Sequence, residues 1–336
     1  MTGRGYIDLT ADRSGRRSGT RGWRCASLLL IASLLFALPS LAAEVAPAER
    51  LQRMGAAMQS TPYEGVFVYS HGDRSETLRV IHAVVDEESR ERVTALSGGA
   101  LEIIRHGTRI ACLMPDQDHA VIGHQPRGML PGALAEGLDD ALEHYRVTSG
   151  GQTRIADREV SEVRLQPVDR YRHEVRLWVD REHDLLLRSD LIGSDGEVLE
   201  RMMFTALEVG QSAGTERFDY SLDDFSRVDE VMAVADGAAA DDLHVTPATP
   251  PGFRLIAIDS GGADSGRQHA VYSDGVTTVS LFIDENVRAG LPSSGGTSAL
   301  AMSSVTVRGY QVTALGAVPV ATLEYMLAGA GSGVGD

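Results

Sequence analysis

The residues whose types and spacing come nearest to a metal site are Asp116, Asp118, His119 and His124. Carboxylate and imidazole groups are common metal ligands, and these four lie close together along the chain. Asp116 follows Pro115, however, and this pairing is typical of a polar turn between two strands. Because a turn explains the cluster without a metal, we predict no metal site and no cofactor.

Sequence motifs for catalysis are missing after residue 43. The chain there has no Gly-x-Ser-x-Gly, Cys-x-x-Cys or His-Glu-x-x-His motif and no phosphate-binding loop. The remaining histidines are spread over different predicted strands. We therefore predict a binding protein and not an enzyme. A hydrolase stays open as an alternative that rests only on scattered His, Asp and Ser residues.

Charge narrows the class of ligand. The chain has a formal net charge of −16, which argues against nucleic acid as a partner. All its basic residues are arginine, the side chain best shaped to contact phosphate or carboxylate with two hydrogen bonds. Arginines on strands can instead be solvated charges that discourage aggregation, and both interpretations stay open. The candidate contacts to a lipid head group are Arg74, Arg79 and Arg105.

The N-terminus predicts export. Several arginines precede residues 25–38, which carry no charge, and small residues follow at 39–43. This order is typical of a cleaved secretory signal, predicted here as residues 1–43. The apolar run is shorter than the roughly 20 residues that a membrane span needs. We expect a soluble mature chain outside the cytoplasm, exported by either the general or the twin-arginine route, with Cys112 as its only cysteine.

The rest of the chain is longer than one compact core usually holds, so two domains are expected. Small and acidic residues at 232–243 predict a linker between a first domain, residues 44–231, and a second, residues 244–328. Residues 329–336 are rich in glycine and predict a loose tail.

The first domain reads as a series of strands after a short amphipathic helix. Several segments show period-two patterning with short connections, which predicts an antiparallel sheet. Some strands are apolar on both faces, so something must cover each face, and we expect a helix on one and a cavity on the other. Residues 132–145 have the helical pattern of a cover. The candidate lining residues of a lipid cavity are Phe67, Tyr69, Leu78, Ile81, Met129, Leu134 and Leu138. An ordinary filled core explains the same pattern.

The second domain contains the clearest local signal, RQHAVYSDGVTTVSLFIDE at residues 267–285. Two apolar-rich runs flank an Asp-Gly pair, which predicts a β-hairpin. Pro319 is suited to the first position of a helix, predicted to continue through Leu327. The expected unit is a small α+β domain.

That hairpin, together with the preceding Pro251-Gly252-Phe253 turn, resembles the C-terminal domain of the MucB/RseB family. A second block, YEGVFVYSHGDRSETLRVIH at residues 63–82 followed by LEIIRHGTRIACLMPD at 101–116, resembles the family's N-terminal domain. The resemblance implies a mainly β, α+β fold. Its first part is a curved antiparallel sheet with covering helices, a half-open barrel of the LolA/LolB type.

The resemblance also implies a function. Members of the family are periplasmic regulators of the envelope-stress sigma factor sigma-E. They bind the periplasmic domain of a single-pass inner-membrane anti-sigma factor of the RseA/MucA type and shield it from proteolysis. Lipopolysaccharide or another acylated lipid releases it. The candidate partner contacts are His269, Tyr272 and Phe282. A homodimer is possible, and a periplasmic carrier of lipids or lipoproteins is the alternative function.

Overall fold

The computed structural model describes residues 45–124, 142–211, 213–230, 243–259, 266–285, 294–296 and 299–330. The predicted signal at 1–43, nearly all of the predicted linker at 232–243 and most of the tail lie outside these residues. So do Met129, Leu134 and Leu138, with most of the predicted helix at 132–145. Within the described ranges, no helix is both long enough and apolar enough to cross a bilayer.

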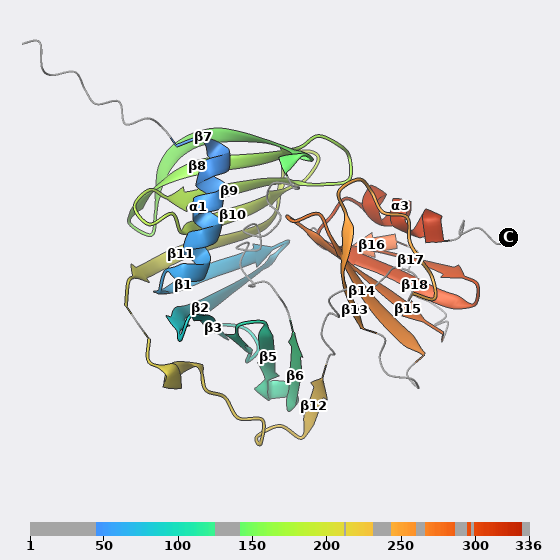
Figure 1. Ribbon diagram of the computed structural model, residues 1–336, viewed down its shortest axis with the longest axis horizontal. Helices are drawn as coiled ribbons and strands as arrows, with labels where there is room; N and C mark the ends of the chain where they lie inside the picture. The colour runs from blue at the N-terminus through green and yellow to red at the C-terminus, as the bar shows by residue number, and fades with distance from the viewer. Residues whose placement is uncertain are drawn as a thin grey trace, which may run out of the picture. The chain divides into compact units, whose positions relative to one another are not determined.

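The first lobe, residues 45–230, is built on a twelve-stranded sheet (Figure 1). Its strands lie in the order β12-β6-β5-β4-β3-β2-β1-β11-β10-β9-β8-β7, and every pair is antiparallel except β12 with β6. The mainly β prediction is confirmed. The strands are β1 (Tyr63–His71), β2 (Arg74–Val85), β3 (Glu88–Ala95), β4 (Glu102–His106), β5 (Arg109–Met114), β6 (His119–His124), β7 (Tyr145–Ile155), β8 (Arg158–Pro167), β9 (Glu174–Asp180), β10 (Leu186–Ile192), β11 (Val198–Val209) and β12 (Arg227–Glu230).

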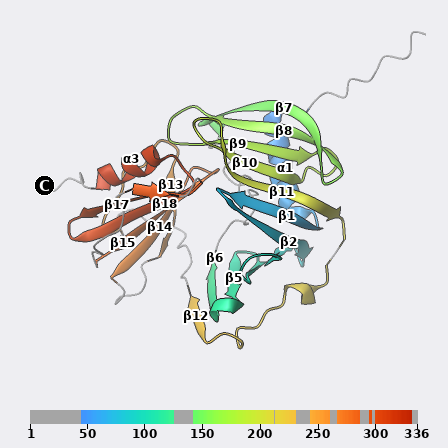
Figure 2. The ribbon, with the colours of Figure 1, turned by 180° about the vertical axis from the view of Figure 1, so that it is seen from behind.

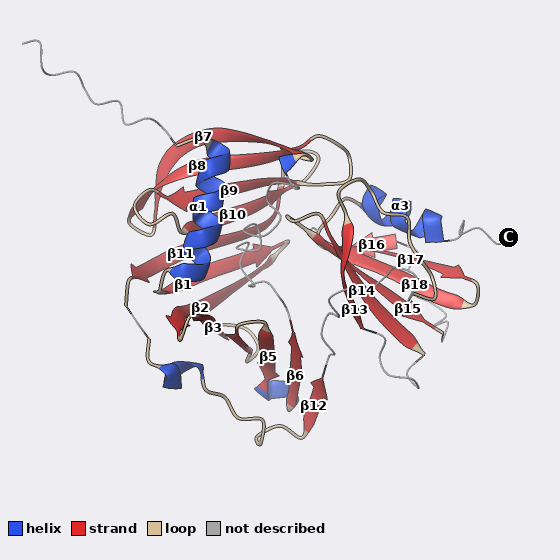
Figure 3. Ribbon diagram, viewed as in Figure 1, coloured by secondary structure: helices blue, strands red, loops and turns tan. Residues whose placement is uncertain are grey.

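Helix α1 (Pro47–Ser60) lies across one face of this sheet (Figure 3). Pro47 begins the helix, where a missing backbone N–H costs nothing. Leu51, Met54 and Met58 follow the 3.6-residue period, and all three are buried in one core cluster with side chains of the sheet. The short amphipathic helix predicted before the strands is therefore confirmed, and it covers this face; the cover predicted at 132–145 is a different segment and stays a prediction.

The opposite face has a cover that the sequence did not reveal. After β11 the chain runs through residues 213–226, here called the return segment, to reach β12 at the far edge of the sheet (Figures 1 and 2). Phe218 of this segment is fully buried against Ile81 and Ala83 of β2. Tyr220, Leu222 and Phe225 pack against a second cluster on β4, β5 and β6.

Polar contacts fasten the return segment to the sheet. Arg217 donates two hydrogen bonds to Glu64 of β1, at 2.7 and 3.1 Å. Arg92 of β3 donates to the carbonyl oxygens of Arg217 and Asp219, at 3.0 and 3.2 Å. The return segment thus buries the second apolar face of the strands, in the place where we expected a cavity.

The second lobe, residues 243–330, has a six-stranded sheet in the order β13-β14-β15-β18-β17-β16. Helix α3 (Val320–Ala330) packs on one face, with Leu323, Met326 and Leu327 buried in the lobe's own core. The expected α+β unit is confirmed, and the helix starts one residue after Pro319. The strands are β13 (Arg254–Asp259), β14 (Arg267–Ser273), β15 (Thr278–Asp284), β16 (Ser294–Gly296), β17 (Ala301–Val307) and β18 (Tyr310–Gly316).

The predicted hairpin is formed by β14 and β15, whose ladder ends at the Ser273–Thr278 pair. Val279, Leu281 and Ile283 point into the core, as the alternation predicted. The connection is longer than a two-residue Asp-Gly turn. It spans Asp274 to Thr277, and Gly275 has a φ of 92° that suits glycine.

Candidate ligand cavity and interlobe joint

The predicted cavity residues on β1 and β2 do not share one face. Phe67 and Leu78 are buried in the core cluster that includes α1, and Tyr69 packs against the same cluster. Ile81 lies on the opposite face, under Phe218 of the return segment. Ile81 is therefore separated from the other three candidates, because residues three apart on a strand point to opposite sides. For all four, contact with a lipid stays a prediction.

The three candidate head-group arginines are not brought together. Arg74 and Arg79 are exposed and point to opposite faces of β2. Arg105 of β4 is only 5 % exposed and is paired in the sheet with Glu91 of β3. Burial lowers the pKa of Arg105, and the negative charge of Glu91 partly opposes this shift. A single phosphate site made by these three residues is therefore not formed.

A buried polar row crosses the first four strands on the face that α1 covers. Its members are adjacent in register, Tyr63 with His82, His82 with Glu91, and Glu91 with Arg105. The rings of Tyr63 and His82 stack at 4.9 Å. His82 Nδ1 lies 2.9 Å from the carbonyl oxygen of Thr61, and Nε2 lies 3.0 Å from Ser89 Oγ. Polar side chains scattered in the sequence thus form one seam across an otherwise apolar surface.

Burial lowers the pKa of His82 below the value of about 6.5 that an exposed histidine has. The unfolded chain therefore binds more protons than the folded chain as the pH falls through 6.5, so the free energy of unfolding decreases with acidification. We expect His82→Gln to make this decrease shallower between pH 7.5 and 5, measured by urea denaturation. His173 and His269, whose pKa values are also lowered by burial, remain in both proteins and serve as the internal reference. Equal slopes for the two proteins would contradict the assignment to His82.

The metal-like cluster folds as the predicted turn. A short 3-10 helix (Pro115–Gln117) connects β5 and β6. Asp116 Oδ2 accepts a hydrogen bond from the backbone of Ala100 at 2.7 Å, and Asp118 Oδ1 accepts one from the backbone of Ser226 at 2.8 Å. These two carboxylates therefore stabilise the neighbouring loops by accepting hydrogen bonds from the backbone.

Arg172 lies at the joint between the two lobes, and its side chain has no exposed area. Its Nε donates to Asp274 Oδ2 at 2.6 Å, and its other nitrogens donate to Asp169 and to the carbonyl oxygen of Pro251. The guanidinium also lies over the rings of Tyr145 and Phe253, at 5.8 and 5.0 Å from the centroids. Three acceptors and two aromatic faces thus hold one cation away from water.

Further contacts join the lobes around this ion pair. Tyr145 of β7 donates to Asp274 at 3.0 Å, and Thr322 of α3 donates to the carbonyl oxygen of Tyr171 at 2.8 Å. Tyr171 and Tyr325 contact each other with ring centroids 5.2 Å apart. The loop between β8 and β9 therefore meets both the β14–β15 hairpin and helix α3.

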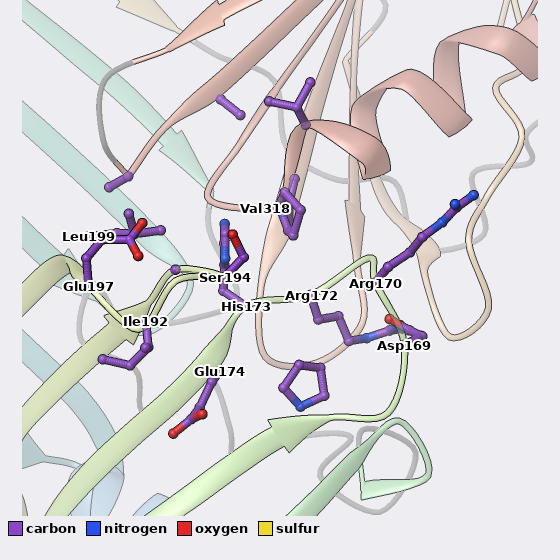
Figure 4. Close-up of a pocket in the computed structure, with 16 residues that line it drawn as sticks. Asp169, Arg170, Arg172, His173, Glu174, Ile192, Ser194, Glu197, Leu199 and Val318 are labelled. Carbon is purple, nitrogen blue, oxygen red and sulfur yellow. The ribbon is translucent and has the colours of Figure 1, made fainter.

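A cavity of about 780 Å³ lies at this joint. Figure 4 shows Val318 of the second lobe together with lining side chains of the first lobe, which are Asp169, Arg170, Arg172, His173, Glu174, Ile192, Ser194, Glu197 and Leu199. Its wall mixes arginine and carboxylate side chains with apolar ones.

A smaller cavity of about 130 Å³ also mixes polar and apolar side chains in its lining. It lies between Tyr145, Val175 and Leu191 of the first lobe and Val276, Thr277 and Ala317 of the second, with His173, Ser189 and Glu200. Burial raises the pKa of Glu200 and lowers that of His173. Both shifts favour the uncharged form of the side chain.

The candidate partner contacts on the second lobe are divided between two faces. His269 and Phe282 stack on one face with centroids 4.4 Å apart. Tyr272 is only 2 % exposed and belongs to the core on the other face. A partner could reach the ring of Tyr272 only by opening the core. For all three residues the role as a partner contact stays a prediction.

The sequence matches the MucB/RseB N-terminal domain over residues 46–222 and the MucB/RseB C-terminal domain over residues 239–330, in that order. The chain belongs to the MucB/RseB family. The resemblance stated from the two sequence blocks is confirmed, and the matched ranges include both sides of the joint. The linker at 232–243 stays a prediction, since residues 231–242 lie outside the described residues.

Members of the family with curated names are similar over most of their length. The sigma factor AlgU regulatory protein MucB of Pseudomonas aeruginosa is 29 % identical over 321 residues, which cover 90 % of this chain and 95 % of the relative. The sigma-E factor regulatory protein RseB of Haemophilus influenzae is 24 % identical over 302 residues, covering 87 % and 93 %. These relatives are regulatory proteins by name.

Solved structures of the family have the same fold. A crystal structure of MucB in complex with MucA(peri) superposes with a TM-score of 0.62 at 23 % identity, covering 83 % of this chain and 96 % of that one. A crystal structure of MucB alone gives a TM-score of 0.61 at 24 % identity.

Proposed function

We propose that this protein is a periplasmic negative regulator of the sigma-E envelope-stress response. It binds the periplasmic domain of a single-pass inner-membrane anti-sigma factor and thereby shields it from regulated proteolysis. The observation that carries the proposal is the match to both MucB/RseB domains in one chain. The names of the relatives and the MucB–MucA(peri) complex support it.

The action we propose is occlusion without chemistry. A regulator that inhibits by covering a partner needs a surface and no catalytic group. The carboxylates of the most metal-like cluster are hydrogen-bonded within loops, and His82 is held between Thr61 and Ser89. This use of polar groups for structure fits a binding protein.

Release by lipopolysaccharide or another acylated lipid is the second part of the proposal. A lipid can weaken the complex only if it prefers an arrangement of the protein that the partner does not. The polar joint between the lobes, with its two cavities, is a place where such arrangements could differ. Lipid sensing therefore requires coupling between the first lobe and the partner site.

A titration tests both parts. We expect a fluorescent periplasmic segment of the anti-sigma factor to bind the mature protein, and saturating lipopolysaccharide to weaken that binding by about tenfold, a typical allosteric coupling. Lipopolysaccharide stripped of its acyl chains is the control and should leave the affinity unchanged. If the anti-sigma segment does not bind, the proposed regulatory function is rejected. If it binds with an affinity that lipopolysaccharide does not change, only the proposed release by lipid is rejected.

A lipid or lipoprotein carrier is the alternative, supported by the large sheet whose apolar face α1 covers. It predicts that the first lobe suffices. The β14–β15 turn of the second lobe is buried against the first lobe, and this contact argues against the carrier, because a carrier made of the first lobe alone would not need it. Transfer of a labelled lipoprotein between membranes without any anti-sigma factor would favour the carrier.

A further inference from the structure

The β14–β15 turn of the second lobe, residues 273–277, reaches into the core of the first lobe. Val276 packs against the same apolar cluster that contains Tyr145, Val175 and helix α1. Residues 273–275 of the turn are buried, although a polar hairpin turn is usually exposed. The turn therefore fills space at the end of the first lobe's apolar face.

Asp274 fixes the shape of the turn and its docking with the same carboxylate. Its Oδ1 accepts hydrogen bonds from the backbone N–H groups of Val276 and Thr277, at 2.9 and 2.8 Å. Its Oδ2 accepts from Tyr145 and Arg172. Because one side chain serves both roles, the carboxylate that shapes the turn also holds the turn, and with it Val276, against the first lobe.

The ion pair between Arg172 and Asp274 makes this docking reversible. Two buried charges attract each other strongly, but most of the gain is offset by the loss of their hydration. When the joint opens, water can hydrate both groups again, so opening costs less than it would for an apolar contact of the same area. A buried ion pair thus specifies the docked position without making it permanent.

The small cavity marks the room that remains between the turn and the sheet. On the first-lobe side its apolar lining includes Val175, Leu191 and the ring of Tyr145. We propose that the turn of residues 273–277 is a displaceable plug, and that an acyl chain binds in its place against Tyr145, Val175 and Leu191. The two occupants cannot be present together, because Val276 already contacts the cluster that the chain would cover.

The lining favours a hydrocarbon over a charged ligand. Glu200 and His173, the titratable groups of this cavity, both have pKa shifts toward their uncharged forms. The inference rests on the proposed lipid sensing and gives it a location. An acyl chain at the joint expels the turn, and the second lobe loses its attachment through Arg172.

Variants that weaken the plug without leaving a buried charge unpaired test the inference. Val276→Ala removes apolar contact, and Tyr145→Phe removes one donor to Asp274 while keeping the ring. Both should bind the fluorescent fatty acid cis-parinaric acid about fivefold more tightly than the wild type, because less competing contact must be broken. The matched control is Thr278→Ala, an exposed residue at the end of the same hairpin, which should leave the affinity unchanged. Displacement of the probe by lipopolysaccharide or by phosphatidylethanolamine vesicles distinguishes the source of the chain.

Hydrogen exchange gives a second readout on the wild-type protein. The amides of Val276 and Thr277 should lose protection when the fatty acid saturates the protein, because the turn leaves the buried joint and its hydrogen bonds to Asp274 become accessible to water. Unchanged protection at saturation, or equal affinities for wild type, Val276→Ala and Tyr145→Phe, overturns the plug; so does absence of probe binding in all proteins. Binding of the anti-sigma segment, measured on the same samples, separates the two proposals: if it persists, only the plug has failed.

Discussion

Replacing Arg172 with methionine is expected to lower the free energy of unfolding by about 3–5 kcal/mol, because it leaves a buried carboxylate without its cation. The side chains of Arg172 and Asp274 both have no exposed area. Asp274 keeps its hydrogen bond from Tyr145 and those from its own turn, but these neutral donors do not replace a positive charge. Urea denaturation, followed by the fluorescence of Trp178, measures the loss.

Two further variants make the result specific. In Arg172→Met combined with Asp274→Asn, both charges are gone, so the loss should be smaller than the sum of the two single losses. Arg154→Met is the control, since its ion pair with Asp157 is 64 % and 93 % exposed on the two sides and should contribute nothing measurable. A loss for Arg172→Met no larger than that of the control would show that the joint is hydrated in solution.

The strand order near each hairpin was predictable because the period-two pattern is local. Residues 267–285 carry the alternation and the turn signal in one stretch, and both strands form there. The apolar character of both faces of β2 also predicted that two covers were needed. That conclusion is right for Leu78, under the cluster of α1, and for Ile81, under Phe218.

The identity of the second cover was not predictable from pattern. Phe218, Tyr220 and Leu222 alternate with polar residues as in a short strand, but Phe225 breaks the alternation, and the pattern does not say which surface these side chains cover. They are placed by contacts with strands more than a hundred residues earlier, such as Arg92 with the carbonyl oxygen of Arg217. A single sequence contains no signal for such a pairing.

The joint was missed for a related reason. Asp274 next to Gly275 is a common turn signal, and Arg172 stands among other arginines that suit a solvated strand end. The two residues are 102 positions apart and become informative only when the lobes meet. The candidate head-group arginines were grouped because they are the same residue type on nearby strands. This grouping ignored the alternation of side chains along a strand, which places Arg74 and Arg79 on opposite faces of β2.

The return segment and the joint together tie the second lobe to the first in two ways. The chain leaves the centre of the sheet at β11, crosses its back and pairs as β12 with β6 before it continues toward the second lobe. The other connection is the noncovalent joint, in which the hairpin turn contacts Tyr145 and Arg172 and helix α3 contacts Tyr171. Of the two connections, the joint is the one for which a ligand in the first lobe could compete. A regulator that responds to lipid and still remains folded needs one connection between its lobes that is permanent and one that a ligand can break.

Phe218→Ala tests how the return segment is fixed to the sheet. The side chain is fully buried between the return segment and β2, and its removal should cost about 3–5 kcal/mol of unfolding free energy, as for other large-to-small changes in a core. The backbone carbonyl of Phe218, which lies 3.0 Å from His106 Nε2, is unchanged, so the loss reports apolar contact. Arg217→Ala is the matched neighbour: its pair with Glu64 is more than a third exposed on both sides and should contribute less than about 1 kcal/mol. Denaturation curves should rank the two changes in that order, and binding of an apolar dye to the uncovered face of β2 should rise only for Phe218→Ala. If Arg217→Ala is the more damaging of the two, the return segment is held by charge, and its apolar side chains are not what fixes it to the sheet.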